Sequence, residues 1–295
     1  LTTEFVADTS SGCQNLSVIF TDLSSNNFDT WFWDFGDGNT SNQQHPTHIY
    51  QNSGIYDVSL TVSTGGQCVS EKKYLDYIDV FESPNIEILV DTSYGCSIPF
   101  DVNFNDLTSN AVSWSWDLGN SLTSNLQNVN TSYTSFGYHD IRLTVTNSLG
   151  CTATRNYSEL INVENIHVDV ALSETSGCLP FETLFKDSIL SSRSITSWQW
   201  NFGDGITSNL QNPTHQYNSP GTFSVLLEVK NDIGCIKDTL LVNFITVDEK
   251  PQINFIANPL LACAGEAIDF TDLSFSPSQI TSWEWNFGDG STSNL

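Results

Sequence analysis

One tryptophan-centred phrase occurs four times in this chain, and its regular recurrence limits the fold more than any other feature. The copies occupy residues 31–38, 114–120, 198–205 and 283–290, and their first tryptophans are 83, 84 and 85 residues apart. A period of this length predicts one small, independently folding domain per copy. A tandem array of similar bodies is typical of a spacer, whereas an active site needs a single set of positioned side chains.

The period divides the 295 residues into three whole repeats and part of a fourth. We expect repeat 1 at residues 1–81, repeat 2 at 82–163, repeat 3 at 164–247 and a truncated repeat 4 at 248–295. The connectors at 82–84, 164–165 and 248–251 are too short to act as flexible tethers. The sequence therefore predicts an elongated rod, which we interpret as an excerpt of a longer protein.

Within a repeat, the apolar residues follow the two-residue period of β-strands and show no helical period. In repeat 3 we expect seven strands near residues 166–172, 181–185, 195–202, 206–207, 214–217, 222–229 and 235–247. Turn-forming Gly, Pro, Asn and Ser residues separate these segments. The pattern predicts an all-β fold in which each repeat is a seven-stranded β-sandwich of the immunoglobulin type.

The two-residue spacing places both tryptophans of each copy on one face of their strand, together with Phe35, Phe202 or Phe287. Paired rings can form a sugar-binding platform, but a face shared with phenylalanine favours the core. We expect these structural core residues: Trp31, Trp33, Trp114, Trp116, Trp198, Trp200, Trp283 and Trp285.

A glycine-rich turn ends each copy of the phrase. The turn residues are Gly36, Asp37, Gly38, Gly203, Asp204, Gly205, Gly288, Asp289 and Gly290. Glycine tolerates positive φ, and an aspartate can accept hydrogen bonds from nearby backbone N–H groups. Asp34 with Asp37 also suggests an acid/base pair or a calcium site. Asn201 and Asn286 replace the first aspartate in repeats 3 and 4, so turn capping is the favoured interpretation.

His48 and His215 are candidate bases or metal ligands, but repeat 2 has Thr131 at the matching position. Neither histidine has a repeated nucleophile or a second histidine at metal-binding spacing. We interpret both as packed, hydrogen-bonded residues. The sequence thus predicts no catalytic, cofactor-binding or metal site, and calcium is the one ion left open.

The formal net charge is −25, from 9 basic and 34 acidic residues. This charge repels phosphate backbones and anionic lipid surfaces, which argues against nucleic acid and membrane-surface partners. The sequence shows no membrane span, so we expect no direct membrane insertion. The seven cysteines form no CxxC pair and lie near no histidine cluster, so they indicate a disulfide framework. A disulfide framework implies an oxidising compartment and hence export.

Two disulfide schemes remain open. In the interdomain scheme Cys13 pairs with Cys151 and Cys96 with Cys235, while Cys68, Cys178 and Cys263 pair outside this sequence. In the intradomain scheme the pairs are Cys13–Cys68, Cys96–Cys151 and Cys178–Cys235, with nearly constant spacings of 55, 55 and 57 residues. The expected five strands between the two cysteines of a repeat place them at opposite ends, roughly 23 Å apart. A disulfide tolerates less than about 7 Å between Cα atoms, so the strand count favours the interdomain scheme.

Residues 46–50 and 213–217 read Pro-Thr-His-x-Tyr, and a glycine-led apolar strand follows at 54–58 and 221–225. Together with the tryptophan phrase, this pattern resembles the PKD (polycystic kidney disease) domain over essentially the whole chain. Repeat 2 departs from it at Leu118, at Asn120 and in the segment 129–133. The resemblance implies a β-sandwich that serves as a spacer or interaction module in surface and secreted proteins, and it implies no catalysis.

The cysteine pattern also resembles the PKD arrays of secreted adhesins and gliding-motility surface proteins of Bacteroidota. We therefore expect a non-catalytic, extracellular stalk segment of a long cell-surface protein used in adhesion or motility. Its expected partners are neighbouring repeats of the same chain, other surface proteins or extracellular polysaccharide. One alternative is the accessory region of a secreted hydrolase. Another is a carbohydrate- or protein-binding module that uses exposed aromatic rings such as Phe28 and Phe32.

Overall fold

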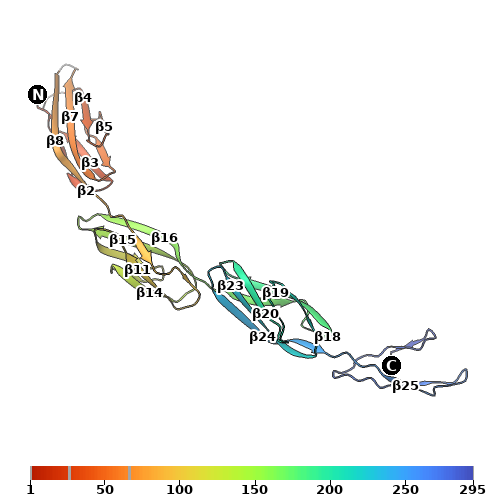
Figure 1. Ribbon diagram of the computed structural model, residues 1–295. Coiled ribbons are helices and arrows are strands. Elements are labelled where there is room, and N and C mark those ends of the chain that lie inside the picture. Colours follow the sequence, from red (N-terminus) through yellow and green to blue (C-terminus); the bar gives the residue numbers. More distant parts are fainter. Residues whose placement is uncertain (1, 26–27, 66–67, 295) are drawn as a thin grey trace. The chain divides into compact units, whose positions relative to one another are not determined.

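The computed structural model describes residues 2–25, 28–65 and 68–294, and every regular element in these residues is a β-strand (Figure 1). The chain divides into two compact units, Leu1–Val163 and Glu164–Leu295. The predicted all-β fold with tandem immunoglobulin-like sandwiches is confirmed. In the described ranges, no helix is long and apolar enough to cross a membrane.

Repeat 1 is a sandwich of a three-stranded sheet, in the order β1-β3-β6, and a five-stranded sheet, in the order β2-β8-β7-β4-β5. Its strands are β1 (Phe5–Ala7), β2 (Ser11–Cys13), β3 (Leu16–Asp22), β4 (Thr30–Asp34), β5 (Thr40–Ser41), β6 (Thr47–Tyr50), β7 (Gly54–Thr64) and β8 (Cys68–Phe81). All neighbouring strands are antiparallel except β2 and β8, which run parallel.

Repeats 2 and 3 have the same two sheets. In repeat 2 the strands are β9 (Ile88–Val90), β10 (Tyr94–Gly95), β11 (Phe100–Asp106), β12 (Ala111–Asp117), β13 (Thr123–Ser124), β14 (Asn128–Tyr133), β15 (Gly137–Asn147) and β16 (Thr152–Val163). In repeat 3 they are β17 (His167–Leu172), β18 (Ser176–Cys178), β19 (Phe181–Leu190), β20 (Ile195–Asn201), β21 (Thr207–Ser208), β22 (Thr214–Tyr217), β23 (Gly221–Asn231) and β24 (Ile236–Asp248).

The structure adds one strand to the seven predicted in repeat 3. The extra strand, β18, lies largely in the segment expected to be a turn and pairs in parallel with the end of β24. A glycine precedes its cysteine because a Cβ at Gly177 would lie 2.3 Å from the ring of Phe181. Since β18 comes before the segment that separates Cys178 from Cys235, the five expected strands between them, β19 to β23, are present.

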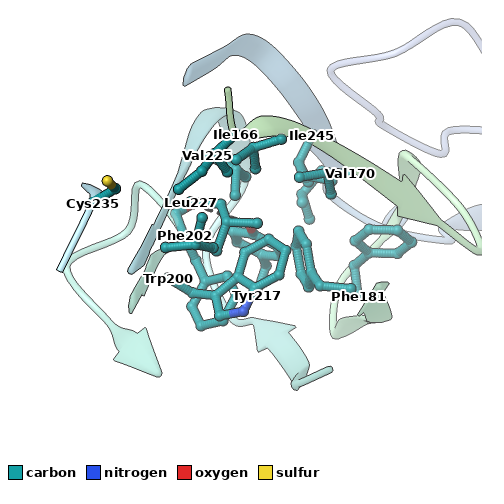
Figure 2. Close-up of a cluster of buried hydrophobic side chains, with 14 residues drawn as sticks. Ile166, Val170, Phe181, Trp200, Phe202, Tyr217, Val225, Leu227, Cys235 and Ile245 are labelled. Carbon is teal, nitrogen blue, oxygen red and sulfur yellow. Dashed lines mark hydrogen bonds between the residues drawn. The ribbon is translucent and has the colours of Figure 1, made fainter. Parts of the chain in front are cut away.

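The second tryptophan of the phrase fills the centre of each complete sandwich. Trp33, Trp116 and Trp200 are fully buried, whereas Trp31, Trp114 and Trp198 are half-buried and pack against the edges of these cores. Figure 2 shows Trp200, Phe202 and Tyr217 gathered in the core of repeat 3, with Cys235 set apart to one side.

A tyrosine on the second strand after the glycine turn, which is β6, β14 or β22, binds that turn to the core. The hydroxyls of Tyr50, Tyr133 and Tyr217 donate to the carbonyl oxygens of Phe35, Leu118 and Phe202 at 3.1, 2.8 and 3.0 Å. The residue after Phe35, Leu118 or Phe202 is glycine for a steric reason. Gly203 has φ +84°, and a Cβ there would lie 2.4 Å from the carbonyl oxygen of Ser224.

Repeat 4 contains two two-stranded sheets, and its aromatic residues lie near the surface. Its strands are β25 (Phe255–Asn258), β26 (Asp269–Asp272), β27 (Trp285–Asn286) and β28 (Thr292–Ser293). Trp283 is 40% exposed and Phe287 39% exposed. The prediction that Trp283 is a core residue is wrong for this structure, because residues 249–294 supply no counterparts of β22, β23 and β24 to cover it.

Candidate functional site: the junction of repeats 1 and 2

Cys13 lies at the end of repeat 1 from which the connector to repeat 2 leaves. It is the last residue of β2 and pairs with Phe81, the last residue of β8. Gln14 N donates to the Phe81 carbonyl oxygen at 3.0 Å, which continues the pairing by one step. The connector therefore starts directly beside the Cys13 backbone.

Cys68 lies at the opposite end of the same repeat. It is the first residue of β8, a strand of 14 residues whose last residue is beside Cys13. β8 bulges opposite Tyr56 and Val58, so its span follows the 11 residues of its partner β7. At about 3.3 Å per residue, the two cysteines are separated by roughly 35 Å. No disulfide spans such a distance, since the Cα atoms of a bridged pair lie within about 7 Å.

A tight turn in repeat 2 presents the second cysteine of the junction. Asn147 N donates to the Cys151 carbonyl oxygen at 2.9 Å, and Gly150 N donates to the Asn147 carbonyl oxygen at 3.1 Å. The side-chain oxygen of Asn147 accepts from Cys151 N at 2.9 Å. These bonds fix the backbone on both sides of Cys151, which is completely buried.

A disulfide joins Cys13 to Cys151, with an S–S distance of 2.09 Å and a Cα–Cα distance of 5.5 Å. This bond links repeat 1 to repeat 2.

The intradomain scheme is wrong for this structure, because Cys13 is not bonded to Cys68, Cys151 is not bonded to Cys96, and Cys178 is not bonded to Cys235. Cys68, Cys178 and Cys263 are free and exposed. Cys96 and Cys235 are not free thiols, and their pairing with each other stays a prediction.

Both repeats hold the connector between them by polar contacts. Asn147 Nδ2 donates to the Glu82 carbonyl oxygen at 2.9 Å, and Ser83 N donates to Gln14 Oε1 at 2.9 Å. Just after the connector, the Ile86 carbonyl oxygen accepts a hydrogen bond from Arg155 at 3.1 Å. The connector is thus fixed by side chains of repeat 1 and repeat 2 in addition to the disulfide.

An aspartate at or near the end of β3, β11, β19 and β26 holds the first tryptophan of each phrase, a contact that the sequence pattern did not predict. The indole N–H of Trp31, Trp114, Trp198 and Trp283 donates to Asp22, Asp106, Asp187 and Asp272 at 2.8, 2.6, 2.6 and 2.7 Å. The only signal in the sequence is an aspartate that recurs 8 to 11 residues before that tryptophan. These carboxylates are therefore structural groups.

The histidines pair with the aspartate of the glycine turn. His48 Nε2 lies 2.7 Å from Asp37 Oδ2, and His215 Nε2 lies 2.8 Å from Asp204 Oδ2. Each ring also stacks on the phenylalanine of the phrase, with centroids about 4 Å apart. Repeat 2 replaces both partners together, and Asn120 Nδ2 donates to Thr131 Oγ1 at 3.0 Å. The contact joins the turn to the neighbouring strand.

The turn aspartates also accept backbone hydrogen bonds within the turn. Asp34 Oδ1 accepts from Gly36 N at 2.9 Å, and Asp37 Oδ1 accepts from Asn39 N at 3.0 Å. Partial burial opposes ionisation of Asp37, but hydrogen bonds from His48 and Asn39 outweigh it and hold the pKa of this carboxyl below its usual value. In the part of the chain that the structure describes, no group of three or more His, Cys, Asp or Glu residues is placed to hold a metal ion.

We expect the Asp37–His48 pair to make repeat 1 sensitive to acid. A folded-state pKa below the unfolded value contributes stability above about pH 4, and this stability is lost as the pH falls through the folded pKa. The double variant Asp37→Asn with His48→Thr copies the neutral pair of repeat 2. Between pH 5 and pH 2.5 it should lose about 1 kcal/mol less free energy of unfolding than the wild type.

Urea titrations at each pH measure this difference, with pulsed hydrogen exchange of peptides from β3 and β6 as the readout for repeat 1. Peptides from β11 and β14 of repeat 2 serve as the internal control, since the neutral Asn120–Thr131 pair does not titrate. Equal acid sensitivity of the wild type and the double variant would show that the pair has no such role.

The aromatic residues proposed for a binding surface do not form one patch. Phe32 is 47% exposed, but Phe28 is 7% exposed and belongs to the core of repeat 1. The expectation that Phe28 is exposed is therefore wrong. The sequence could not indicate this, because Phe28 lies outside the alternating pattern of the tryptophan strand.

Comparisons with known proteins identify the repeats. A family model described as PKD domain matches residues 3–80, 82–161 and 172–245. Over 58 residues, the chain is 45% identical to collagenase ColA of Bacillus cereus, a match that covers 20% of this chain and 6% of that protein. Over 147 residues, it is 27% identical to the pre-pro-metalloprotease PrtV of Vibrio cholerae serotype O1, which covers 48% of this chain and 16% of that protein. The chain thus matches less than a fifth of either relative.

Two solved structures match this chain at low sequence identity and low TM-score. The three N-terminal domains of the bacteriophage RB49 outer capsid protein Hoc match with 11% identity and a TM-score of 0.40, over 84% of this chain and 99% of that one. The mouse nectin-like molecule 4 ectodomain matches with 10% identity and a TM-score of 0.41, over 81% of this chain and 97% of that one.

Proposed function

Since the chain belongs to the PKD-domain family, we propose that it is a non-catalytic, extracellular spacer within the stalk of a long cell-surface protein used in adhesion or surface motility. Its work in this proposal is mechanical. Neighbouring repeats of the same chain are its immediate partners. Other surface proteins or extracellular polysaccharide are the partners of the protein as a whole, which can take the form of a filament.

The Cys13–Cys151 disulfide is the observation that carries this proposal. Tension applied to the two chain ends follows the shortest covalent path, so it passes from Cys13 directly to Cys151. The intervening residues, which include β3 to β8 and β9 to β15, are left unloaded. A covalent bypass of this kind protects folded domains in a chain that carries tension, and disulfides persist mainly outside the cytosol.

We extend the same scheme to the other junctions, with Cys96 paired to Cys235 and with Cys68, Cys178 and Cys263 paired to repeats outside this sequence. Cys178 supports this extension because it occupies in repeat 3 the place of Cys13 in repeat 1. It ends β18 opposite Asp248, the last residue of β24, and Leu179 N donates to the Asp248 carbonyl oxygen at 3.0 Å.

Non-reducing peptide mapping of a longer protein with five complete repeats tests the proposal. The thiols are alkylated before unfolding so that disulfides cannot exchange. We expect peptides that link Cys13 to Cys151, Cys96 to Cys235 and Cys178 to a cysteine of a completed repeat 4. Peptides that link Cys178 to Cys235 would show separately locked domains and would contradict a stapled spacer.

A second candidate function is the accessory region of a secreted protease. The similarity to parts of a collagenase and a metalloprotease favours it. Assays of the full-length protein on collagen and casein distinguish the two functions. Hydrolysis that slows when repeats 1 to 3 are deleted would support the accessory role, and the absence of hydrolysis would support the spacer.

A further inference from the structure

Asn147 contacts both the cysteine turn and the connector. Its side-chain oxygen accepts hydrogen bonds from Leu149 N at 3.0 Å and from Cys151 N at 2.9 Å. Because both partners are N–H donors, this atom of the carboxamide must be the oxygen. The nitrogen therefore faces Glu82 and donates to its carbonyl oxygen at 2.9 Å. The side chain is buried, so little water competes for these bonds.

These contacts form a continuous path from one cysteine of the junction to the other. Cys13 lies beside Phe81 in the parallel pairing, and Glu82 directly follows Phe81. Asn147 binds Glu82 with one end of its carboxamide and the Cys151 amide with the other. Fixing the Glu82 carbonyl therefore fixes the position of Cys13 relative to Cys151 independently of the S–S bond.

Asn231 of repeat 3 matches Asn147, and comparing the two distinguishes the turn-building role from the connector-binding role. Asn231 Oδ1 accepts from Cys235 N at 2.8 Å, and Asn231 exchanges the same backbone bonds with its cysteine turn. Its Nδ2, however, is buried without a hydrogen-bond partner in the residues that the structure describes. The turn-building role thus belongs to both asparagines, while the connector bond is seen at Asn147.

We propose that Asn147 is a positioning residue for the interdomain disulfide. Its Nδ2 holds the connector so that the Cys13 and Cys151 thiols already face each other before the bond forms. The inference rests on the proposed spacer function, because it explains how a bond between two separate domains forms in preference to bonds with outside thiols. The connector bond and the disulfide stabilise each other, as two coupled contacts must.

The size of the effect follows from the effective concentration of one thiol at the other. Loss of one buried hydrogen bond lowers that concentration by about three- to tenfold. The equilibrium between the Cys13–Cys151 disulfide and glutathione should shift by the same factor. The free energy of unfolding of repeat 2 is a different quantity from this thiol–disulfide equilibrium. A residue that only stabilised repeat 2 would therefore leave the equilibrium unchanged.

The substitution Asn147→Asp removes the connector bond and keeps the turn bonds. Aspartate retains an oxygen for the Leu149 and Cys151 amides, but its second oxygen cannot donate to the Glu82 carbonyl oxygen and repels it. The experiment uses the full chain with Cys68, Cys178 and Cys263 replaced by serine, equilibrated in glutathione redox buffers and quenched with acid. Peptide mapping then gives the oxidised fraction of Cys13 and Cys151. We expect the equilibrium constant for formation of the Cys13–Cys151 disulfide to fall about threefold or more, because the lost bond and the new repulsion act in the same direction.

Asn231→Asp is the matched control, and it should leave the Cys13–Cys151 equilibrium unchanged. Hydrogen exchange of β15 and β16 verifies that repeat 2 remains folded in Asn147→Asp. If repeat 2 is unfolded in that variant, Asn147→Ser is used in its place. A serine hydroxyl can still cap the turn but is too short to reach Glu82. An equilibrium constant within twofold of the wild type in a folded variant would overturn the inference. Absence of the Cys13–Cys151 bond in the wild type would instead overturn the proposed function.

Discussion

Pulled by its two ends, the oxidised chain should reach a maximum length roughly 470 Å shorter than the same chain after reduction. The two bonded cysteines are 138 residues apart in the sequence, and each extended residue adds about 3.4 Å. While the disulfide holds, none of these residues contributes to the length. Single-molecule force spectroscopy measures this difference directly, on one molecule before and after addition of a reductant.

The experiment needs Cys13 and Cys151 as the only cysteines, with the other five replaced by serine, so that every change in length belongs to one bond. A further Cys13→Ser substitution provides the control, and that chain should reach the longer length under both conditions. An oxidised chain that extends as far as the reduced one would show that tension does not bypass the two repeats.

The substitution Trp200→Ala should lower the free energy of unfolding of repeat 3 by about 3–5 kcal/mol. The ring is fully buried against Phe185 and Phe202, and its N–H donates to the Leu210 carbonyl oxygen at 3.0 Å. Its removal leaves a cavity and an unpaired carbonyl group. Urea titration with pulsed hydrogen exchange of peptides from β23 and β24 gives the free energy of this repeat.

Trp198→Ala is the matched control two residues away on the same strand. Its ring is half-buried, and its partner Asp187 keeps a hydrogen bond from Gln211 when the indole is removed. We expect a clearly smaller loss of stability than in Trp200→Ala. If Trp200→Ala kept full stability and instead abolished binding to a polysaccharide, the tryptophans would form a binding platform and the core interpretation would be wrong.

The fold could be predicted because its main determinants are local and repeated. Alternation along residues 195–202 places Trp198 and Trp200 on one face whatever the rest of the chain does. The short strand β18 could not be predicted in this way. It has three residues, and its stability comes from parallel pairing with Thr246, Val247 and Asp248, which are distant in sequence.

The junction could be predicted only in part. Strand counting placed Cys13 and Cys68 at opposite ends of repeat 1, because each antiparallel strand reverses the direction of the chain. The roles of Asn147 and the connector depend on how two separate domains meet, which no local pattern encodes. A weak signal exists in the recurrence of Asn-x-x-Gly-Cys at residues 147–151 and 231–235.

The 14-residue strand β8 also has a consequence for the order of events during biosynthesis. Domains generally fold in order from the N-terminus, so repeat 1 folds before repeat 2 presents Cys151. Once β8 has formed, it holds the Cys13 and Cys68 thiols roughly 35 Å apart. The folded domain itself therefore prevents a Cys13–Cys68 bond, and it keeps Cys13 available until repeat 2 has folded.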